Sequence, residues 1–152
     1  MKLVIGLGNP GQKYQHSRHN VGHMVIDQLP VQKNYLKTDG YMNESGIFVQ
    51  KQVHFYKIDL SDLYIVHDDL DLPVGEYRLQ FDRGPAGHHG VESIIQHLGS
   101  QAFWRLRIGI GHPIDLTPVE DYVLRPFTPD EKVLISQTID KISKEILNIS
   151  GH

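Results

Sequence analysis

The chain has 152 residues, a formal charge of −3 and no cysteine. This length suits one domain, and the lack of cysteine excludes a disulfide framework, a thiol nucleophile and a thiolate metal site. A negative net charge argues against a general nucleic-acid coating protein but leaves room for a local basic patch. No apolar run reaches the roughly 20 residues of a membrane helix, and the N-terminus predicts a strand and turn rather than a signal peptide. We therefore expect a cytoplasmic protein that does not bind membranes.

Apolar periodicity predicts strands that alternate with helices. Strands are expected at 2–7, 35–38, 63–66, 76–81 and 105–110, and helices at 19–29, 45–56, 90–98 and from 129 onward. The last helix is the clearest, because Thr128, Pro129 and Glu131 form a typical helix start and isoleucines then repeat along one face. The pattern predicts an α/β fold over residues 1–152: a single-domain three-layer sandwich whose mixed, mostly parallel sheet has helices on both faces.

The stretch Gly6-Leu7-Gly8-Asn9-Pro10-Gly11 follows the first predicted strand and matches the dinucleotide pattern G-x-G-x-x-G. Asp27 stands near the distance of a ribose-binding acid. A dinucleotide site needs a helix N-terminus at the third glycine, however, and Asn-Pro-Gly favours a turn. A tight turn is the simpler interpretation, and a nucleotide-dependent enzyme remains an alternative.

Ten histidines in this length direct attention to imidazole chemistry. His19 and His23 have the i, i+4 spacing of a zinc site, for which Asp68 or His88 could be a third ligand. No glutamate stands beside either histidine to act as a base, so general-base catalysis by His19 is favoured and zinc remains an alternative. Asp68 follows an apolar strand, where a carboxylate can fix the tautomer of a catalytic histidine.

Two further segments are weaker candidates. The glycine-rich loop at 84–90 precedes a predicted helix, whose free N–H groups can hold an anion. The segment 41–46, Tyr-Met-Asn-Glu-Ser-Gly, predicts a helix entry with a polar cap, and its asparagine can donate and accept hydrogen bonds at once.

Taken together, these motifs are far more specific than any one of them alone. The chain carries Gly-Leu-Gly-Asn-Pro-Gly at 6–11, Arg-His-Asn-Val-Gly at 18–22, Tyr-Met-Asn-Glu-Ser-Gly at 41–46, His-Asp-Asp-Leu-Asp-Leu-Pro at 67–73, Gly-His-His-Gly at 87–90 and Arg-Leu-Arg-Ile-Gly-Ile-Gly-His-Pro at 105–113. In this order they resemble the bacterial-type peptidyl-tRNA hydrolase family from Lys2 to about Ile149, and Asp121-Tyr122-Val123-Leu124 fits it as well.

The resemblance implies a carboxylic ester hydrolase that cleaves the ester between a peptide and the 3′ end of tRNA, without a cofactor or metal. It implies that His19 activates water, that Asp68 orients His19, and that Asn9 and Asn43 position the water and the peptide or its oxyanion. The implied substrate-binding residues are Tyr14, Asn20, Tyr41, Met42, Asn43, His88 and His89. The implied contacts to the tRNA acceptor stem are Arg78, Arg105 and Arg107. The partner would be peptidyl-tRNA, bound by a monomer.

The chain departs from the family pattern in three places. His89 stands where the family has an asparagine, which predicts weaker or more pH-sensitive activity because a protonated ring cannot accept a hydrogen bond. The chain is shorter between about 30 and 41, and it ends soon after the last helix. These departures motivate an alternative: a degenerate relative that binds tRNA or peptide ends with weak or no hydrolysis.

Overall fold

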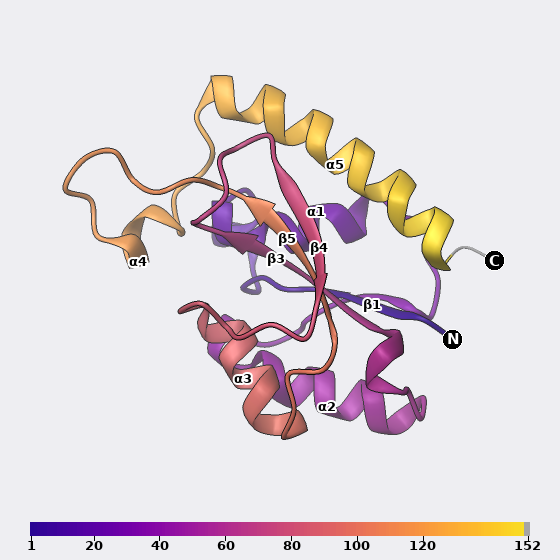
Figure 1. Cartoon of the computed structure of the whole chain (residues 1–152). Helices are drawn as coiled ribbons and strands as arrows, with labels where there is room; N and C mark the ends of the chain where they lie inside the picture. Colours follow the sequence, from indigo (N-terminus) through magenta and orange to yellow (C-terminus); the bar gives the residue numbers. More distant parts are fainter. Residues whose placement is uncertain (151–152) are drawn as a thin grey trace.

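Five strands form one sheet in the computed structural model, which describes residues 1–150 (Figure 1). The strands are β1 (Leu3–Gly6), β2 (Tyr35–Lys37), β3 (Leu63–Asp69), β4 (Tyr77–Phe81) and β5 (Trp104–Gly109). Their order is β2-β1-β3-β5-β4, with β4 antiparallel to β5 and every other pair parallel. The predicted mixed, mostly parallel sheet is confirmed.

Helices cover both faces of this sheet, as Figure 1 shows. One face carries α1 (Val21–Asp27) and α5 (Pro129–Ser150), and the other carries α2 (Ser45–Phe55) and α3 (His89–Leu98). The short helix α4 (Val119–Tyr122) lies on a loop that projects beyond the sheet. Four 3₁₀ turns complete the chain: η1 (Gln12–Tyr14), η2 (Arg18–Asn20), η3 (Met42–Glu44) and η4 (Leu60–Asp62).

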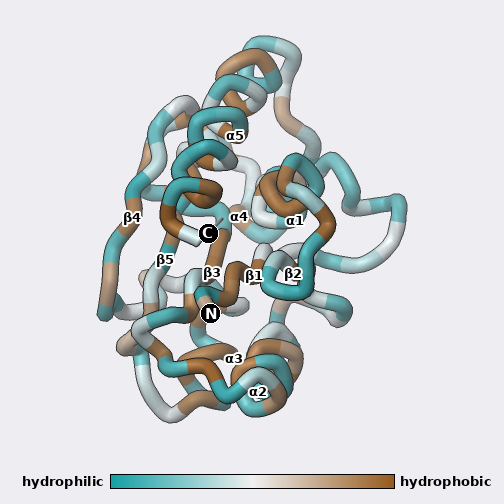
Figure 2. Tube along the Cα trace, turned by 90° about the vertical axis from the view of Figure 1, so that its right-hand side faces the viewer, coloured by the Kyte–Doolittle hydropathy of each residue, from teal (hydrophilic) through white to brown (hydrophobic). Residues whose placement is uncertain are grey.

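Alternation along the strands divides the apolar core into two halves. On β1, Val4 packs with the α1 and α5 side, whereas Leu3 and Ile5 pack with the α2 and α3 side. Successive side chains of a strand point to opposite faces, so one strand supplies both cores. Each fully buried aliphatic side chain stabilises the fold by about 1.5–3 kcal/mol. Figure 2 shows the hydrophobic segments of the helices on the sides that face the sheet.

Two element boundaries differ from the sequence prediction, and both affect the site. The predicted helix at 19–29 begins as the 3₁₀ turn η2, becomes α-helical at Val21 and ends at Asp27. β3 does not end at Val66 but continues to Asp69, because Asp68 and Asp69 pair with Ile108 and Gly109 of β5. Asp68 is therefore the penultimate residue of a buried strand rather than part of a loop.

The start of α1 lies unusually close to the sheet. A Cβ atom on Gly22 would be 2.3 Å from the carbonyl oxygen of Val66, and one on Gly6 would be 2.3 Å from that of Gly22. Only glycine permits this backbone approach. The contact brings η2, and with it His19, against the carboxyl ends of β1 and β3.

The helix α5 starts as predicted. The Thr128 N–H donates to Glu131 Oε1 at 2.8 Å, and the Glu131 N–H donates to Thr128 Oγ1 at 3.3 Å, which is a capping box. Ile135, Ile139, Ile142 and Ile146 are buried on one side of the helix. No helix within residues 1–150 is both long enough and apolar enough to cross a membrane.

Candidate active site

A cleft of about 680 Å³ opens where β1 and β3 end. Its lining comes from the loop after β1, the end of β3, the loop before α3, the η3 turn and the α4 region. The carboxyl ends of parallel strands are where α/β proteins bind ligands, since the loops that leave the sheet converge there. Asn9, His19, Asn43 and Asp68, which come from four of the motifs, all line this cleft.

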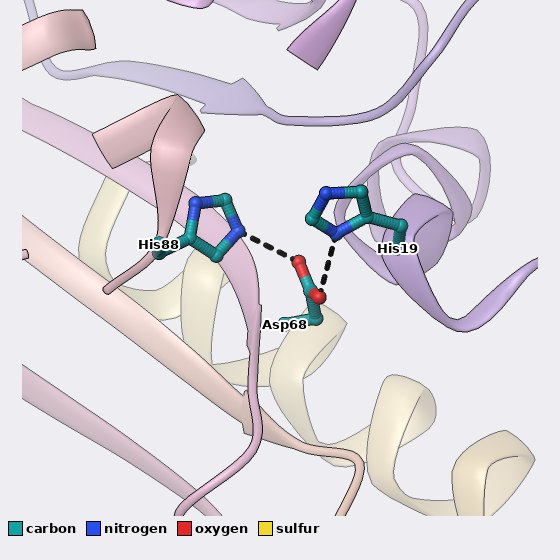
Figure 3. A group of neighbouring side chains, drawn as sticks. All are labelled: His19, Asp68 and His88. Carbon is teal, nitrogen blue, oxygen red and sulfur yellow. Dashed lines mark hydrogen bonds and ion pairs between the residues drawn. The ribbon is translucent and has the colours of Figure 1, made fainter. Parts of the chain in front are cut away.

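Asp68 lies between two histidines in this cleft (Figure 3). Its Oδ2 is 2.7 Å from Nδ1 of His19, and its Oδ1 is 2.8 Å from Nε2 of His88. The Asp68 side chain is only 3% exposed, and a buried carboxylate needs such partners. Because each oxygen binds a different ring, one carboxylate orients both imidazoles.

The hydrogen bonds determine where the protons lie on the neutral rings. Nδ1 of His88 accepts the Val91 N–H at 3.2 Å, so the His88 proton is on Nε2, toward Asp68. His19 uses Nδ1 to donate to Asp68, which leaves its Nε2 as an acceptor without a partner in the described residues. His19 also lines the cleft. It can therefore take a proton from a molecule bound there.

The charges in this group act on the protonation states. Burial disfavours a positive His19, but the attraction and hydrogen bond of Asp68 outweigh it and raise the pKa of His19 above its ordinary value. Burial likewise disfavours a negative Asp68, yet the two histidines hold the pKa of its carboxyl well below its usual range. Asp68 is therefore ionised at neutral pH, as an orienting partner must be.

His67 supports this group, although the sequence offered only its place before Asp68 as a signal. It is buried, and its ring centroid lies 4.9 Å from that of His88 in an edge-on contact. Its Nδ1–H donates to the Asp68 carbonyl oxygen at 2.7 Å. Burial, with the nearby His88, lowers the pKa of His67, so it is a neutral ring that packs behind His88.

Asn9 enters the cleft on a rigid backbone. Its N–H donates to Asn20 Oδ1 and its carbonyl accepts from Asn20 Nδ2, both at 2.9 Å. Its own Oδ1 accepts the Met42 N–H at 2.8 Å. The Nδ2 group of Asn9 makes no hydrogen bond within residues 1–150 and remains available as a donor. Asn20, expected to contact substrate, is 2% exposed and instead holds Asn9 in place.

Of the other residues expected to contact substrate, some line the cleft and one does not. Tyr41, Met42, Asn43 and His88 line the cleft, whereas Tyr14 is not among the lining residues. Tyr41 and Asn43 are exposed there, while Met42 is buried with its N–H bound to Asn9. The α4 region adds an apolar wall that motif reasoning did not assign to the site, formed by Val119, Val123 and Leu124.

His89 lies at the rim rather than beside the base. Its side chain is 80% exposed, and its nearest ionic partner is Glu92, with Nδ1 and Oε2 3.7 Å apart. His89 lines the cleft but makes no hydrogen bond to His19 or Asp68 within residues 1–150, so the weaker or more pH-sensitive activity expected from its place in the motif stays a prediction.

Two of the three arginines expected to contact tRNA point inward, which corrects that expectation. Arg105 is 1% exposed and donates to the carbonyl oxygens of Phe103, Arg83 and Gln101. Arg107 is 5% exposed, and its Nε donates to Asp69 Oδ2 at 2.7 Å. Burial requires such partners, so neither guanidinium is available to a surface ligand. Arg78 on β4 is exposed.

The zinc alternative based on His19 and His23 does not match the geometry. His23 Nε2 lies 3.0 Å from Thr38 Oγ1, and the ring packs where a Cβ atom on Gly8 would be. Among residues 1–150, ligand atoms with metal-binding spacing occur on His19, Asp68 and His88, within 4.8 Å of one another. These atoms are joined by hydrogen bonds, so the group has the form of a carboxylate between two protonated ring nitrogens.

The nucleotide alternative also lacks its structural requirement. Gly11 has a φ of 94°, a turn conformation, and only the three-residue turn η1 follows it. A dinucleotide phosphate needs the N-terminus of a helix at this place.

The fold and the site define an α/β protein in which a buried carboxylate orients a histidine and a fixed amide donor lies nearby, an arrangement suited to general-base chemistry. A family model described as peptidyl-tRNA hydrolase matches residues 3–37 and 31–151. The peptidyl-tRNA hydrolases of Geobacillus thermodenitrificans and Aquifex aeolicus are each 44% identical to this chain in the aligned region. The alignments cover 91% and 93% of this chain, and 87% and 85% of the relatives. The chain belongs to the peptidyl-tRNA hydrolase family.

Solved structures agree with this assignment. The crystal structure of peptidyl-tRNA hydrolase from Acinetobacter baumannii has a TM-score of 0.88 at 32% identity, and the match covers 99% of this chain and 89% of that one. A peptidyl-tRNA hydrolase complex with N-propanol also has a TM-score of 0.88 at 32% identity, covering 96% of this chain and 86% of that one.

Proposed function

We propose that this protein hydrolyses the ester bond between a peptide and the 3′ end of tRNA, and so recycles peptidyl-tRNA. The observation that carries the proposal is the 2.7 Å contact between His19 Nδ1 and Asp68, which leaves Nε2 of His19 free in the cleft. The proposal is supported by two relatives that are named peptidyl-tRNA hydrolase and that align with this chain over most of their length.

The chemistry follows from these groups. Nε2 of His19 removes a proton from water as the water oxygen attacks the ester carbonyl carbon. Asp68 stabilises the imidazolium that forms. The Nδ2 donor of Asn9, with Asn43 nearby, stabilises the negative oxygen of the tetrahedral intermediate. The imidazolium then returns its proton to the leaving 3′ oxygen of the ribose, which releases the peptide acid and the tRNA.

The substrate would occupy two parts of the cleft. Its peptide would lie along the apolar wall of Val119, Val123 and Leu124. The acceptor stem would lie on the side of Arg78, and a small number of cations would reconcile a polyanionic substrate with a protein whose formal charge is −3. We further propose that the protein acts as a cytoplasmic monomer without a cofactor.

The shortened segment near 30–41 is part of the proposal. The alignment with the Geobacillus relative runs over 162 positions, more than the 152 residues of this chain, so the relative has residues without a counterpart here. The two segments matched by the family model overlap at residues 31–37, which include the three-residue edge strand β2, and this overlap supports that location.

The test is release of the peptide from a purified peptidyl-tRNA. The wild-type protein should release it, and His19→Ala should lose at least about a hundredfold in kcat, the contribution typical of a general base. His54→Ala, which removes an exposed imidazole at the end of α2, is the matched control and should keep full activity. Binding without release by the wild-type protein would instead establish the degenerate relative.

A further inference from the structure

Arg18, the residue before the base, is buried against the cleft wall. Its side chain has two ordered contacts: Nη1 donates to the Tyr122 carbonyl oxygen at 3.1 Å, and Nη2 donates to Glu131 Oε1 at 2.8 Å. The guanidinium also lies 4.0 Å from the centre of the Tyr122 ring. Arg18 is 5% exposed, so this cation is anchored inside the protein and does not reach a ligand.

The backbone of Arg18 and His19 is bonded to the same region of the chain as the Arg18 side chain. The Arg18 N–H donates to the Arg125 carbonyl at 3.0 Å, and the His19 N–H donates to the Val123 carbonyl at 2.8 Å. Val123 lines the cleft together with His19. The catalytic base and the apolar wall are therefore joined by direct hydrogen bonds.

His19 depends on these contacts because its own element is weak. η2 has three residues and no side-chain cap, so few of its own hydrogen bonds hold the backbone of His19. Glu131, in contrast, stands in the first turn of the 22-residue helix α5 and also belongs to its capping box. The ion pair thus connects a short turn to the longest rigid element of the fold.

We propose that Arg18 and Glu131 are positioning residues, whose ion pair holds His19 toward Asp68 and fixes the cleft wall relative to the base. The proposal rests on the proposed function of His19 as the base. It predicts that loss of the pair alters catalysis by displacing His19, beyond any effect on folding.

Two single substitutions separate the ion pair from the helix cap. Oε1 of Glu131 accepts both the Arg18 Nη2–H and the Thr128 N–H, so Glu131→Gln keeps an acceptor oxygen for the cap but removes the negative charge that holds the guanidinium. Thr128→Ala removes the other half of the capping box and leaves the ion pair. Glu131→Gln should lower kcat by about tenfold or more with a smaller change in KM, whereas Thr128→Ala should lower the melting temperature and leave kcat unchanged.

A double variant guards against a simple folding defect. Arg18→Met with Glu131→Gln removes the buried charge together with its partner, and such replacements often restore stability. If the pair only stabilised the fold, this variant would regain the wild-type kcat once its melting temperature recovered. If the pair positions His19, kcat should remain low, because the double variant lacks both the bond to Glu131 and the bond to the Tyr122 carbonyl.

The decisive readout needs no substrate. The ring of His19 faces the charged Asp68 from β3 and the His88 ring from the loop before α3, whose centroid is 5.2 Å away. If His19 moves away from Asp68, its pKa, measured by NMR titration of the ring, should fall toward or below that of a free histidine in Glu131→Gln but not in Thr128→Ala. Unchanged titration and kcat in a folded Glu131→Gln protein would overturn the proposal. An inactive wild-type protein would overturn the proposed function instead, and the titration would still test the positioning.

Discussion

Replacing Asp68 with asparagine should inactivate His19 as a base, because the proton of its neutral ring should move from Nδ1 to Nε2. The carboxylate accepts one hydrogen bond on each oxygen, from His19 and from His88. An amide has only one oxygen, so it can accept from only one of these rings. His88 must keep its proton on Nε2, since its Nδ1 is bound to the Val91 N–H. In Asp68→Asn the amide oxygen should therefore face His88 and the amide N–H₂ should face His19.

The N–H₂ group then requires a lone pair on Nδ1 of His19, which moves the proton to Nε2. The nitrogen that should take a proton from water would already carry one. A tautomer fault of this kind lowers kcat by about 10⁴-fold in a Ser-His-Asp enzyme, which corresponds to about 5.4 kcal/mol of transition-state stabilisation. KM should change little, because Asp68 is buried and its two oxygens are bound to His19 and His88.

Single-turnover release of peptide from peptidyl-tRNA measures this loss, and Asp140→Asn, an exposed carboxylate on α5, is the control for the amide change. Adding His88→Ala to Asp68→Asn should recover about tenfold of the lost rate, because the amide oxygen is then free to turn toward His19. A fall of less than about tenfold in Asp68→Asn, or no recovery in the double variant, would refute the tautomer argument.

Four further outcomes are expected. EDTA should leave hydrolysis unchanged, and activity that EDTA abolishes and zinc restores would contradict an imidazole base. Arg78→Ala should reduce the slope of log affinity for tRNA against log salt concentration by about one, and equal slopes for this variant and wild type would remove Arg78 from the interface. Arg105→Gln should instead lower the melting temperature, because the Arg105 side chain is buried. Burial, together with the charge of Lys37, lowers the pKa of His23 to about 4. The unfolded chain then binds a proton before the native state does, so stability should fall as the pH drops from about 6.5 toward 4, by at most about 3 kcal/mol for this group, and urea unfolding of His23→Gln should show a flatter pH dependence. His89→Asn should change kcat by less than about twofold because the side chain is 80% exposed, and a clear gain with a simpler acid limb in the pH profile would restore the sequence-based role of His89.

Features that depend on local patterns could be predicted from the amino-acid sequence alone. The start of α5 follows from Thr128, Pro129 and Glu131, and its buried face follows from the spacing of its isoleucines, because capping and helical periodicity act within a few residues. Alternating apolar runs likewise predicted the strands and the layered α/β class. The motifs, through their resemblance to a known family, indicated His19, Asp68 and Asn9 as members of one site.

The environment of each polar side chain, in contrast, depends on how remote segments pack together. Arg105 and Arg107 look like surface cations in the sequence, and only the packing of β5 between β3 and β4 buries them among carbonyl and carboxylate oxygens. Asn20 holds the backbone of Asn9 because the turn after β1 folds back onto η2. The bond between Arg18 and Glu131 joins residues 113 positions apart. A charge or amide is assigned to the interior or to a ligand by partners from remote segments, and no local pattern specifies those partners.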